Sequence, residues 1–284
     1  MSLLDRLTDE VIARNHGLQT LKPVIEKEIL HQDILREMSQ AGFLKKLTFI
    51  GGTCLRNCYN SPRLSEDIDF TGGTDFQKDE LSELGNTLRD KISERYGMQV
   101  EVSEPRREIG DTATWKIKVI TRPDRPDLPT QRIHIDICAA SSFERKPAML
   151  MNRYQVDMGT SGLVIYAESR EEILADKFLA LAQRPNRVKQ RDVWDIVWLN
   201  KQSIQLKPEL LSRKLDERNI SHHEYLQDLE ERIDTIKNGH KDFLFEIRRF
   251  VPMEVVKDTL EKPEYWDITL EVIQDAYKHL SRTM

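Results

Sequence analysis

Two aspartates, Asp67 and Asp69, are the residues of this 284-residue chain whose spacing most directly indicates chemistry. They flank Ile68 in a segment that we expect to form a buried strand, and residues two apart on a strand point to the same side. Two carboxylates held this close repel each other and stay ionised when a cation neutralises them. Mg²⁺ is a hard ion that takes oxygen ligands and is usually shared with substrate phosphates. The pair therefore predicts a Mg²⁺ site, with Mn²⁺ as the alternative ion.

A Gly-Gly turn, Gly51 and Gly52, precedes these acids in the sequence. We expect it to follow a short buried strand at 47–50 and to open a helix. Because glycine has no Cβ, backbone N–H groups at such a turn can approach phosphate oxygens closely. The turn alone is weak evidence, since the chain has neither a G-x-x-x-x-G-K-[ST] loop nor a G-x-G-x-x-G fingerprint. Together with the aspartates it predicts a metal-dependent enzyme that handles phosphates.

A third carboxylate, Asp136, lies on the polar side of an alternating strand expected at 132–138, whose other side carries isoleucines. If this strand neighbours the strand of the first two aspartates, three carboxylates converge, which is enough for two metal ions. Asp136 could also accept the proton of an attacking hydroxyl as a general base. The alternative is a structural role, in which Asp136 pairs with Lys116 or Lys118 across a hairpin.

Polar residues around the Gly-Gly turn are candidates for nucleotide binding. Arg56 follows the turn by about one helical turn and could reach phosphate or the two aspartates. Arg63 and Ser65 precede the aspartates by a few residues and could fix their strand or contact nucleotide. Arginines are common on protein surfaces, so a structural role is the alternative for each.

A second charged cluster is expected on two helices that follow residue 168. Lys177 has apolar neighbours on its helix, and its ammonium could hold a triphosphate as a point charge. Asp192 and Asp195 open the next helix, where carboxylates interact favourably with the helix dipole. We expect one of them to orient Lys177. The alternative is a structural cluster in which Asp192 caps the helix and Asp195 pairs with Lys177 or Arg191.

These candidates form three sets. The catalytic set is Asp67, Asp69, Asp136, Lys177, Asp192 and Asp195, and the metal ligands among them are Asp67, Asp69 and Asp136. The nucleotide-binding set is Gly51, Gly52, Thr53, Arg56, Arg63, Ser65 and Lys177. A basic stretch between the two helices, Arg184, Arg187, Lys189 and Arg191, could contact an RNA backbone, although a solvated loop would have the same composition.

The elements that carry these residues predict two domains. Residues 1–165 combine helical patterns, including 18–38 and 75–96, with several short strand patterns, which indicates an α/β (α+β) domain with N-terminal helices. Residues 166–284 are helical in pattern almost throughout, which indicates an all-helical C-terminal domain. The strands are expected at 47–50, 66–70, 98–102, 114–121 and 132–138.

Composition and charge exclude some classes of protein. The net charge of −5 argues against a surface covered in nucleic-acid-binding charge, although 43 lysines and arginines leave room for a local basic groove. No apolar run approaches the roughly 20 residues needed to span a bilayer. The first residues carry acids where a signal peptide needs basic ones, and three cysteines fit a reducing compartment. We therefore expect a cytoplasmic protein without a membrane partner.

Three motifs resemble a known family. Gly-Gly-Thr-x-Leu-Arg at 51–56, Arg-x-Ser-x-Asp-Ile-Asp-Phe at 63–70, and Lys177 with Arg-Asp-x-x-Asp at 191–195 resemble the AbiEii/MenT nucleotidyltransferase toxins, of the DNA polymerase β-type nucleotidyltransferase superfamily. The resemblance covers roughly residues 45 to 200. It implies a nucleotidyltransferase core with a mixed sheet, in which Asp67 and Asp69 are metal ligands and Asp136 is the third. It also implies that Lys177 binds nucleotide and that one acid of the 192/195 pair is needed for activity.

The resemblance further implies a Mg²⁺-dependent transfer of a nucleotide from an NTP to an acceptor, with release of pyrophosphate. Such proteins are toxins of type IV toxin–antitoxin systems, with a separate antitoxin encoded nearby, often of winged-helix type. In one branch the acceptor is the 3′ end of tRNA, so translation and growth stop. Two alternatives remain open, namely a transferase that modifies a protein or a small molecule such as an aminoglycoside, and a catalytically idle module that binds nucleotide or a partner.

Overall fold

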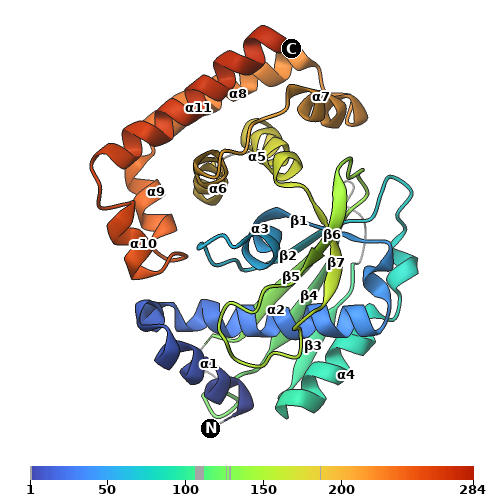
Figure 1. The fold of residues 1–284 in the computed structure, drawn as a ribbon. Coiled ribbons are helices and arrows are strands. Elements are labelled where there is room, and N and C mark those ends of the chain that lie inside the picture. Colours follow the sequence, from blue (N-terminus) through green and yellow to red (C-terminus); the bar gives the residue numbers. More distant parts are fainter. Residues whose placement is uncertain (1, 106–111, 126, 128, 186) are drawn as a thin grey trace. The chain divides into compact units, whose positions relative to one another are not determined.

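The computed structural model describes residues 2–284 except 106–111, 126, 128 and 186 (Figure 1). It divides the chain into two compact units, Met1–Glu168 and Ser169–Met284. The N-terminal unit contains a seven-stranded mixed sheet with helices, and the regular elements described in the C-terminal unit are all helical. The expected α+β fold with a helical C-terminal region is therefore confirmed. None of the described helices combines the length and hydropathy that crossing a membrane requires.

The N-terminal unit begins with a helix that its own first residues cap. The Ser2 hydroxyl accepts from the amide of Asp5 at 3.1 Å, and the Asp5 carboxylate accepts from the amide of Ser2 at 3.1 Å. This reciprocal capping fixes the start of the first helix.

The N-terminal unit contains four α-helices and seven strands among its described residues. The helices are α1 (Leu3–Arg14), α2 (Lys22–Gln40), α3 (Gly51–Tyr59) and α4 (Leu84–Tyr96), and the strands are β1 (Thr48–Ile50), β2 (Ile68–Thr71), β3 (Val100–Ser103), β4 (Thr112–Val119), β5 (Gln131–Cys138), β6 (Arg145–Met149) and β7 (Val164–Glu168).

The strands form one sheet in the order β3-β4-β5-β2-β1-β7-β6. The pairs β2–β5 and β1–β7 are parallel, and the other neighbouring pairs are antiparallel. The β2–β5 register places Asp69 opposite Asp136. The predicted convergence of the carboxylates required these two strands to be neighbours, and they are.

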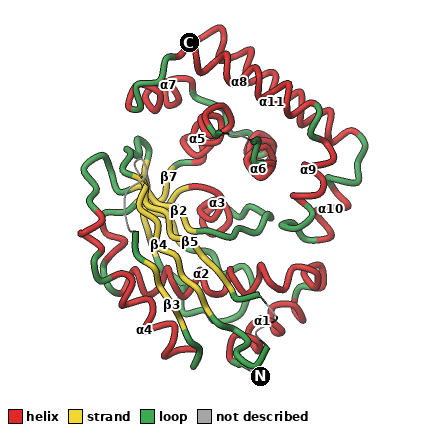
Figure 2. Tube along the Cα trace, turned by 180° about the vertical axis from the view of Figure 1, so that it is seen from behind, coloured by secondary structure: helices red, strands yellow, loops and turns green. Residues whose placement is uncertain are grey.

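Alternate residues of β5 point into two environments. Ile133, Ile135 and Ile137 are fully buried. Gln131, which lies in the same alternation, donates to the Glu26 carboxylate of α2 at 2.7 Å, so this face of the sheet is the one that α2 covers (Figure 2). Asp136 lies in the opposite alternation. The apolar isoleucines and Asp136 thus occupy opposite faces of the same strand.

Two strands were missed in the sequence, and one expected helix is shorter. The missed strands, β6 and β7, complete one side of the sheet next to β1. β6 has the sequence Arg-Lys-Pro-Ala-Met and is largely exposed, so it lacks an apolar alternation, and its proline is tolerated because the strand lies at the edge. The helix expected over 75–96 is a 3₁₀ turn, Lys78–Leu81, followed by α4.

The C-terminal unit begins with Ser169, whose hydroxyl caps the next helix by accepting from the amide of Glu172 at 3.1 Å. A buried lysine, Lys214, joins the first and third helices of this unit through ion pairs with Glu172 at 2.9 Å and Asp176 at 2.8 Å. Each of the three groups thus has an oppositely charged partner, and the Asp176 side chain is partly exposed, so the burial of Lys214 and Glu172 is tolerated. The helices are α5 (Arg170–Gln183), α6 (Gln190–Lys201), α7 (Pro208–Glu217), α8 (His222–Lys237), α9 (His240–Ile247), α10 (Met253–Asp258) and α11 (Glu264–Thr283).

A buried ion pair joins α2 to α3 and to the loop that leads into β2. Arg56 of α3 donates to both carboxylate oxygens of Glu28 of α2, at 2.9 and 3.1 Å from Nε. Its Nη1 donates to the carbonyls of Ser61 and Pro62, and its Nη2 donates to Glu28 and to the Tyr154 hydroxyl. Burial alone would lower the pKa of Arg56, but Glu28 and Tyr154 outweigh it and raise the pKa above its ordinary value. The guanidinium therefore stays charged in the interior.

We predict that Glu28→Gln lowers the free energy of unfolding by about 3–5 kcal/mol, because it leaves the Arg56 cation buried without its counter-charge. Urea denaturation measures this change. Glu94→Gln is the matched control, since the Glu94 side chain is 75% exposed and faces Lys91 at the surface, and it should leave stability unchanged. A loss below about 1 kcal/mol for Glu28→Gln would show that the neighbouring carbonyls and Tyr154 suffice to hold the arginine.

Candidate active site

Three acidic side chains lie on one face of the sheet, where β2 and β5 run side by side. Asp69 and Asp136 are direct neighbours in the register. Asp67 precedes β2 and shares the alternation of Asp69. Its Oδ1 accepts from the backbone amide of His134 at 3.2 Å and lies 3.6 Å from the His134 ring nitrogen Nδ1. Asp67 is therefore turned toward β5.

Asp136 is oriented by a neighbouring strand. Its Oδ1 accepts from the Thr114 hydroxyl at 2.7 Å, and Thr114 lies opposite Asp136 in the β4–β5 register. Of the lysines considered as partners for Asp136, Lys116 lies opposite His134, and Lys118 pairs with Glu101 at 3.1 Å. The observed hydrogen bond fixes the Asp136 carboxylate without neutralising it.

The Gly-Gly turn begins α3 directly beside Asp69. Gly51 has a φ of +74°, and a Cβ there would lie 2.7 Å from Asp69 Oδ2. A Cβ at Gly52 would overlap the Arg63 guanidinium. The Thr53 hydroxyl donates to the backbone carbonyl of Asp67. Glycine at 51 and 52 thus allows the start of a helix to approach both the Asp69 carboxylate and the Arg63 guanidinium.

The remaining predicted nucleotide-binding residues of this unit are buried supports of the loop before β2. Arg63 and Ser65 are 3% and 6% exposed. Arg63 donates to the carbonyl of Leu64 at 2.9 Å, and the amide of Ser65 donates to Glu28 at 3.2 Å. Both residues therefore fix the segment that leads to the aspartates, which is one of the two roles expected for them.

Arg56 has a different environment from the one expected. Each of its N–H groups has an acceptor in Glu28, in the carbonyls of residues 61 and 62, or in Tyr154. A guanidinium has five N–H donors, so none is left over for a phosphate in this arrangement. Arg56 therefore acts as a positioning residue for the loop, and the structure does not place it against the aspartates.

The carboxylates of the sheet fit a divalent metal ion that is shared with substrate. Within the residues that the structure describes, no group of three or more His, Cys, Asp or Glu side chains is gathered in a way that could hold a metal ion. Mg²⁺ is usually held by one or two carboxylates plus substrate phosphates rather than by an all-protein cage. Asp69 and Asp136, hard oxygen donors opposite each other on adjacent strands, fit that requirement. The role expected for Asp67 as a further ligand stays a prediction.

The second cluster lies within the C-terminal unit. Lys177 of α5 contacts both acids of α6, with Nζ 2.7 Å from Asp192 Oδ1 and 2.8 Å from Asp195 Oδ2. Arg184 also contacts Asp192 at 3.0 Å. Burial alone would raise the pKa of Asp192, but Lys177, Lys189 and Arg184 outweigh burial and hold the pKa below its ordinary value. Both aspartates, rather than one, orient Lys177, and the cluster also binds α5 to α6.

Most side chains of the basic stretch, which leads into α6, contact other residues of this unit. Arg184 pairs with Asp192, and Arg191 pairs with Glu246 at 3.2 Å while its guanidinium lies 4.6 Å from the centre of the Phe250 ring. Burial lowers the pKa of Lys189. Arg187 is the exposed member of the four. The stretch therefore presents less free positive charge than its composition suggests.

Two residues that contact the acids, His134 and Thr114, were not predicted from the sequence. His134 precedes Asp136 by two positions, so the period of the strand places both on the same face. Thr114 lies at a strand start opposite Asp136, and only the register reveals that contact. His134 could have been predicted from the alternation of the strand. Thr114 could not, because its contact is visible only when the pairing of β4 with β5 is known.

We predict that Lys177→Met lowers the free energy of unfolding by about 3–5 kcal/mol at pH 7, because two carboxylates remain buried without their shared cation. In the wild type, the lowered pKa of Asp192 means that its ionised form stabilises the fold above the unfolded-state value of about 3.9 and is lost only below it. In the variant, Asp192 keeps Lys189 and Arg184 but loses the cation that lowers its pKa most, so we expect that pKa to rise and the destabilisation to be smaller at pH 5 than at pH 7.

Urea denaturation at both pH values measures this difference. Lys241→Met is the control, because Lys241 is exposed on α9. Adding Asp195→Asn to Lys177→Met should restore part of the stability, since it removes one uncompensated charge. A pH-independent loss would contradict the electrostatic explanation.

Comparisons with known proteins identify a family and a shared fold. The family described as "Nucleotidyl transferase AbiEii toxin, Type IV TA system" matches residues 33–270. No curated protein sequence matches the chain. Among solved structures, MenT4, a nucleotidyltransferase toxin from Mycobacterium tuberculosis, is 14% identical, with 96% of this chain and 98% of that chain covered and a TM-score of 0.53. JHP933 from Helicobacter pylori is also 14% identical, with 92% and 94% covered and a TM-score of 0.50. The structures share the fold, and the family match shows that this chain belongs to the AbiEii nucleotidyltransferase toxins of type IV toxin–antitoxin systems.

Proposed function

We propose that this nucleotidyltransferase toxin transfers a nucleotide from an NTP to the 3′ end of tRNA in a Mg²⁺-dependent reaction, and that it thereby inhibits translation and growth. The observation that carries the proposal is the register of β2 and β5, which sets Asp69 opposite Asp136, together with the glycine turn that brings the start of α3 against Asp69. The family supplies the reaction class. The metal and the acceptor are part of the proposal.

The glycine turn is the proposed phosphate-binding element. The first N–H groups of a helix lack partners within the helix and favour anions. In α3 these groups belong to the Gly51-Gly52-Thr53 start, beside the Asp69 carboxylate. A triphosphate bound there would meet a negative side chain, and the repulsion requires a cation between them. This juxtaposition is the physical argument for a metal at the site.

Asp69 and Asp136 would hold Mg²⁺, which supplies positive charge to the transferring phosphoryl group and polarises the acceptor hydroxyl. Asp136 is the proposed acceptor of the proton from that hydroxyl, and the Thr114 hydrogen bond fixes its orientation. The hydroxyl oxygen forms a bond to the α-phosphorus, the bond to the bridging oxygen breaks, and pyrophosphate leaves with the electron pair. His134 holds Asp67 in place on the same face.

Lys177 is proposed to bind nucleotide, with Asp192 and Asp195 as its positioning residues. The contacts to both acids fix its ammonium at 2.7 and 2.8 Å from their oxygens. The proposed partners are an NTP, tRNA and an antitoxin of the winged-helix type. Family membership implies an antitoxin, and its type and mode of action belong to the proposal.

The test is incubation of the full chain with Mg²⁺, each of four α-³²P-labelled NTPs and total cellular RNA. Label in tRNA-sized RNA with one preferred NTP is the expected result. If the label appears on protein instead, the acceptor is a protein and the tRNA part of the proposal is wrong. Pyrophosphate release without labelled macromolecule would indicate a small-molecule acceptor, and nucleotide binding without pyrophosphate would favour the idle module.

We predict that Asp69→Asn and Asp136→Asn each reduce transfer by about 10²–10⁴-fold, since each removes a charge that acts on the transferring group or its proton. Both variants should keep wild-type stability within about 1 kcal/mol, because asparagine preserves the shape. Initial rates of label transfer measure the loss. Asp79→Asn is the control, since Asp79 is exposed in the 3₁₀ turn before α4. Full activity in either site variant would remove that residue from the mechanism.

A further inference from the structure

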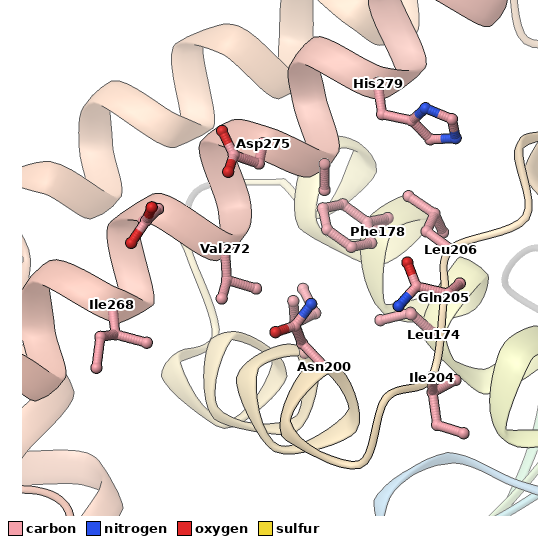
Figure 3. Close-up of a pocket in the computed structure, with 13 residues that line it drawn as sticks. Leu174, Phe178, Asn200, Ile204, Gln205, Leu206, Ile268, Val272, Asp275 and His279 are labelled. Carbon is pink, nitrogen blue, oxygen red and sulfur yellow. The ribbon is translucent and has the colours of Figure 1, made fainter.

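A cavity of about 510 Å³ lies inside the C-terminal unit, between α5, α6, the loop that follows α6, and α11 (Figure 3). Its volume falls in the range of sites for small organic molecules. Its wall along α11 faces Asn200, Gln205 and Leu206 across the opening (Figure 3). All of the lining residues belong to this one unit, so the cavity is distinct from the carboxylates of the sheet.

The floor of the cavity is apolar. Leu174 and Phe178 of α5 and Ile196 of α6 are nearly fully buried, at 3%, 1% and 1% exposed, and Ile204 is 6% exposed. Val272 of α11 adds a further apolar contact. Because Leu174, Phe178, Ile196 and Ile204 are already shielded from water, they shape the floor and offer little surface to a ligand. The accessible apolar surface comes from Leu206, Ile268 and Val272, and covering it favours binding.

The rim is polar and carries negative charge. Glu271 and Asp275 stand one helical turn apart on α11, and both line the cavity. The lining contains no lysine or arginine, and its other polar members are amides and His279. Asp275 also contacts Lys278 at the surface at 2.8 Å. An apolar floor below two carboxylates is complementary to an apolar body that ends in a cation.

We propose that this cavity binds a small hydrophobic amine, with its apolar body on Leu206, Ile268 and Val272 and its protonated nitrogen between Glu271 and Asp275. The amides of Asn200 and Gln205 offer carbonyl acceptors for the remaining N–H groups. An anionic ligand of the same shape is disfavoured, because it would meet two carboxylates without a compensating cation.

The position of the cavity connects it to the charged cluster of the same unit. Phe178 follows Lys177 on α5, and Ile196 follows Asp195 on α6. The cavity therefore borders the two helices whose mutual position the Lys177 ion pairs fix. Occupancy should accordingly stabilise the helical unit, because a ligand that binds the folded state alone raises its stability by mass action.

The experiment compares three probes of one shape with the full chain, namely 4-phenylbutylamine, 4-phenylbutanol and 4-phenylbutyrate, each titrated by calorimetry and by thermal unfolding. The amine should bind saturably and raise the unfolding temperature. It should bind about tenfold more tightly than the alcohol, as expected for hydrogen bonds to a charged group. The carboxylate should bind more weakly than the alcohol.

Variants locate the site. Glu271→Gln with Asp275→Asn should reduce amine affinity about tenfold, to that of the alcohol. Asp267→Asn is the control, because it also removes a negative charge from α11. Asp267 is exposed and does not line the cavity. Gln205→Lys, at an exposed rim position, should abolish amine binding and leave the helical content measured by circular dichroism unchanged.

Three outcomes would overturn the proposal. Equal affinity for all three probes would mean that the carboxylates do not select the ligand. Amine binding that survives Gln205→Lys would place the amine elsewhere on the protein. A dimer in sedimentation that Gln205→Lys dissociates would mean that side chains of a second copy occupy the cavity.

Discussion

The ion pair between Glu28 and Arg56 is the interaction on which the arrangement of the N-terminal unit depends. It links α2, which covers the apolar face of the sheet, to α3, which begins at the glycine turn. The same arginine holds the carbonyls of residues 61 and 62, and the same glutamate accepts from the amide of Ser65. One buried pair of charges thus sets the path of the loop that delivers the aspartates.

The glycine turn adds a second constraint, which is steric. The start of α3 can lie against Asp69 only where residue 51 has no Cβ, and its φ of +74° also favours glycine. Ile50, at the end of β1, pairs with Asp69 across the antiparallel β1–β2 register. Strand pairing therefore fixes the acid and the helix start at the same level of the sheet, and the turn allows them to approach.

The sequence predicted those parts of the fold and site that depend on local pattern. The alternation of Ile133, Ile135 and Ile137 located β5 and its polar face, and the Gly-Gly and Asp-x-Asp spacings located the candidate site. Arg56 could not be placed, because its partner Glu28 lies 28 residues earlier and only the packing of α2 on α3 brings them together. β6 was missed because an exposed edge strand has no apolar periodicity to detect.

The cluster around Lys177 and the acids on the sheet differ in how far the protein itself compensates their negative charge. In the helical unit, Lys177 and Arg184 compensate Asp192 and Asp195 through ion pairs of 2.7 to 3.0 Å, so this cluster is satisfied by the protein itself. On the sheet, the described partners of Asp67 and Asp136 are neutral or weakly basic groups, namely the Thr114 hydroxyl and the His134 amide and ring. Such hydrogen bonds orient a carboxylate but do not cancel its charge. Asp67 and Asp136 are therefore suited to recruit charge from outside the chain, whereas the pairs around Lys177 hold two helices together and fix the position of the ammonium that we propose binds nucleotide.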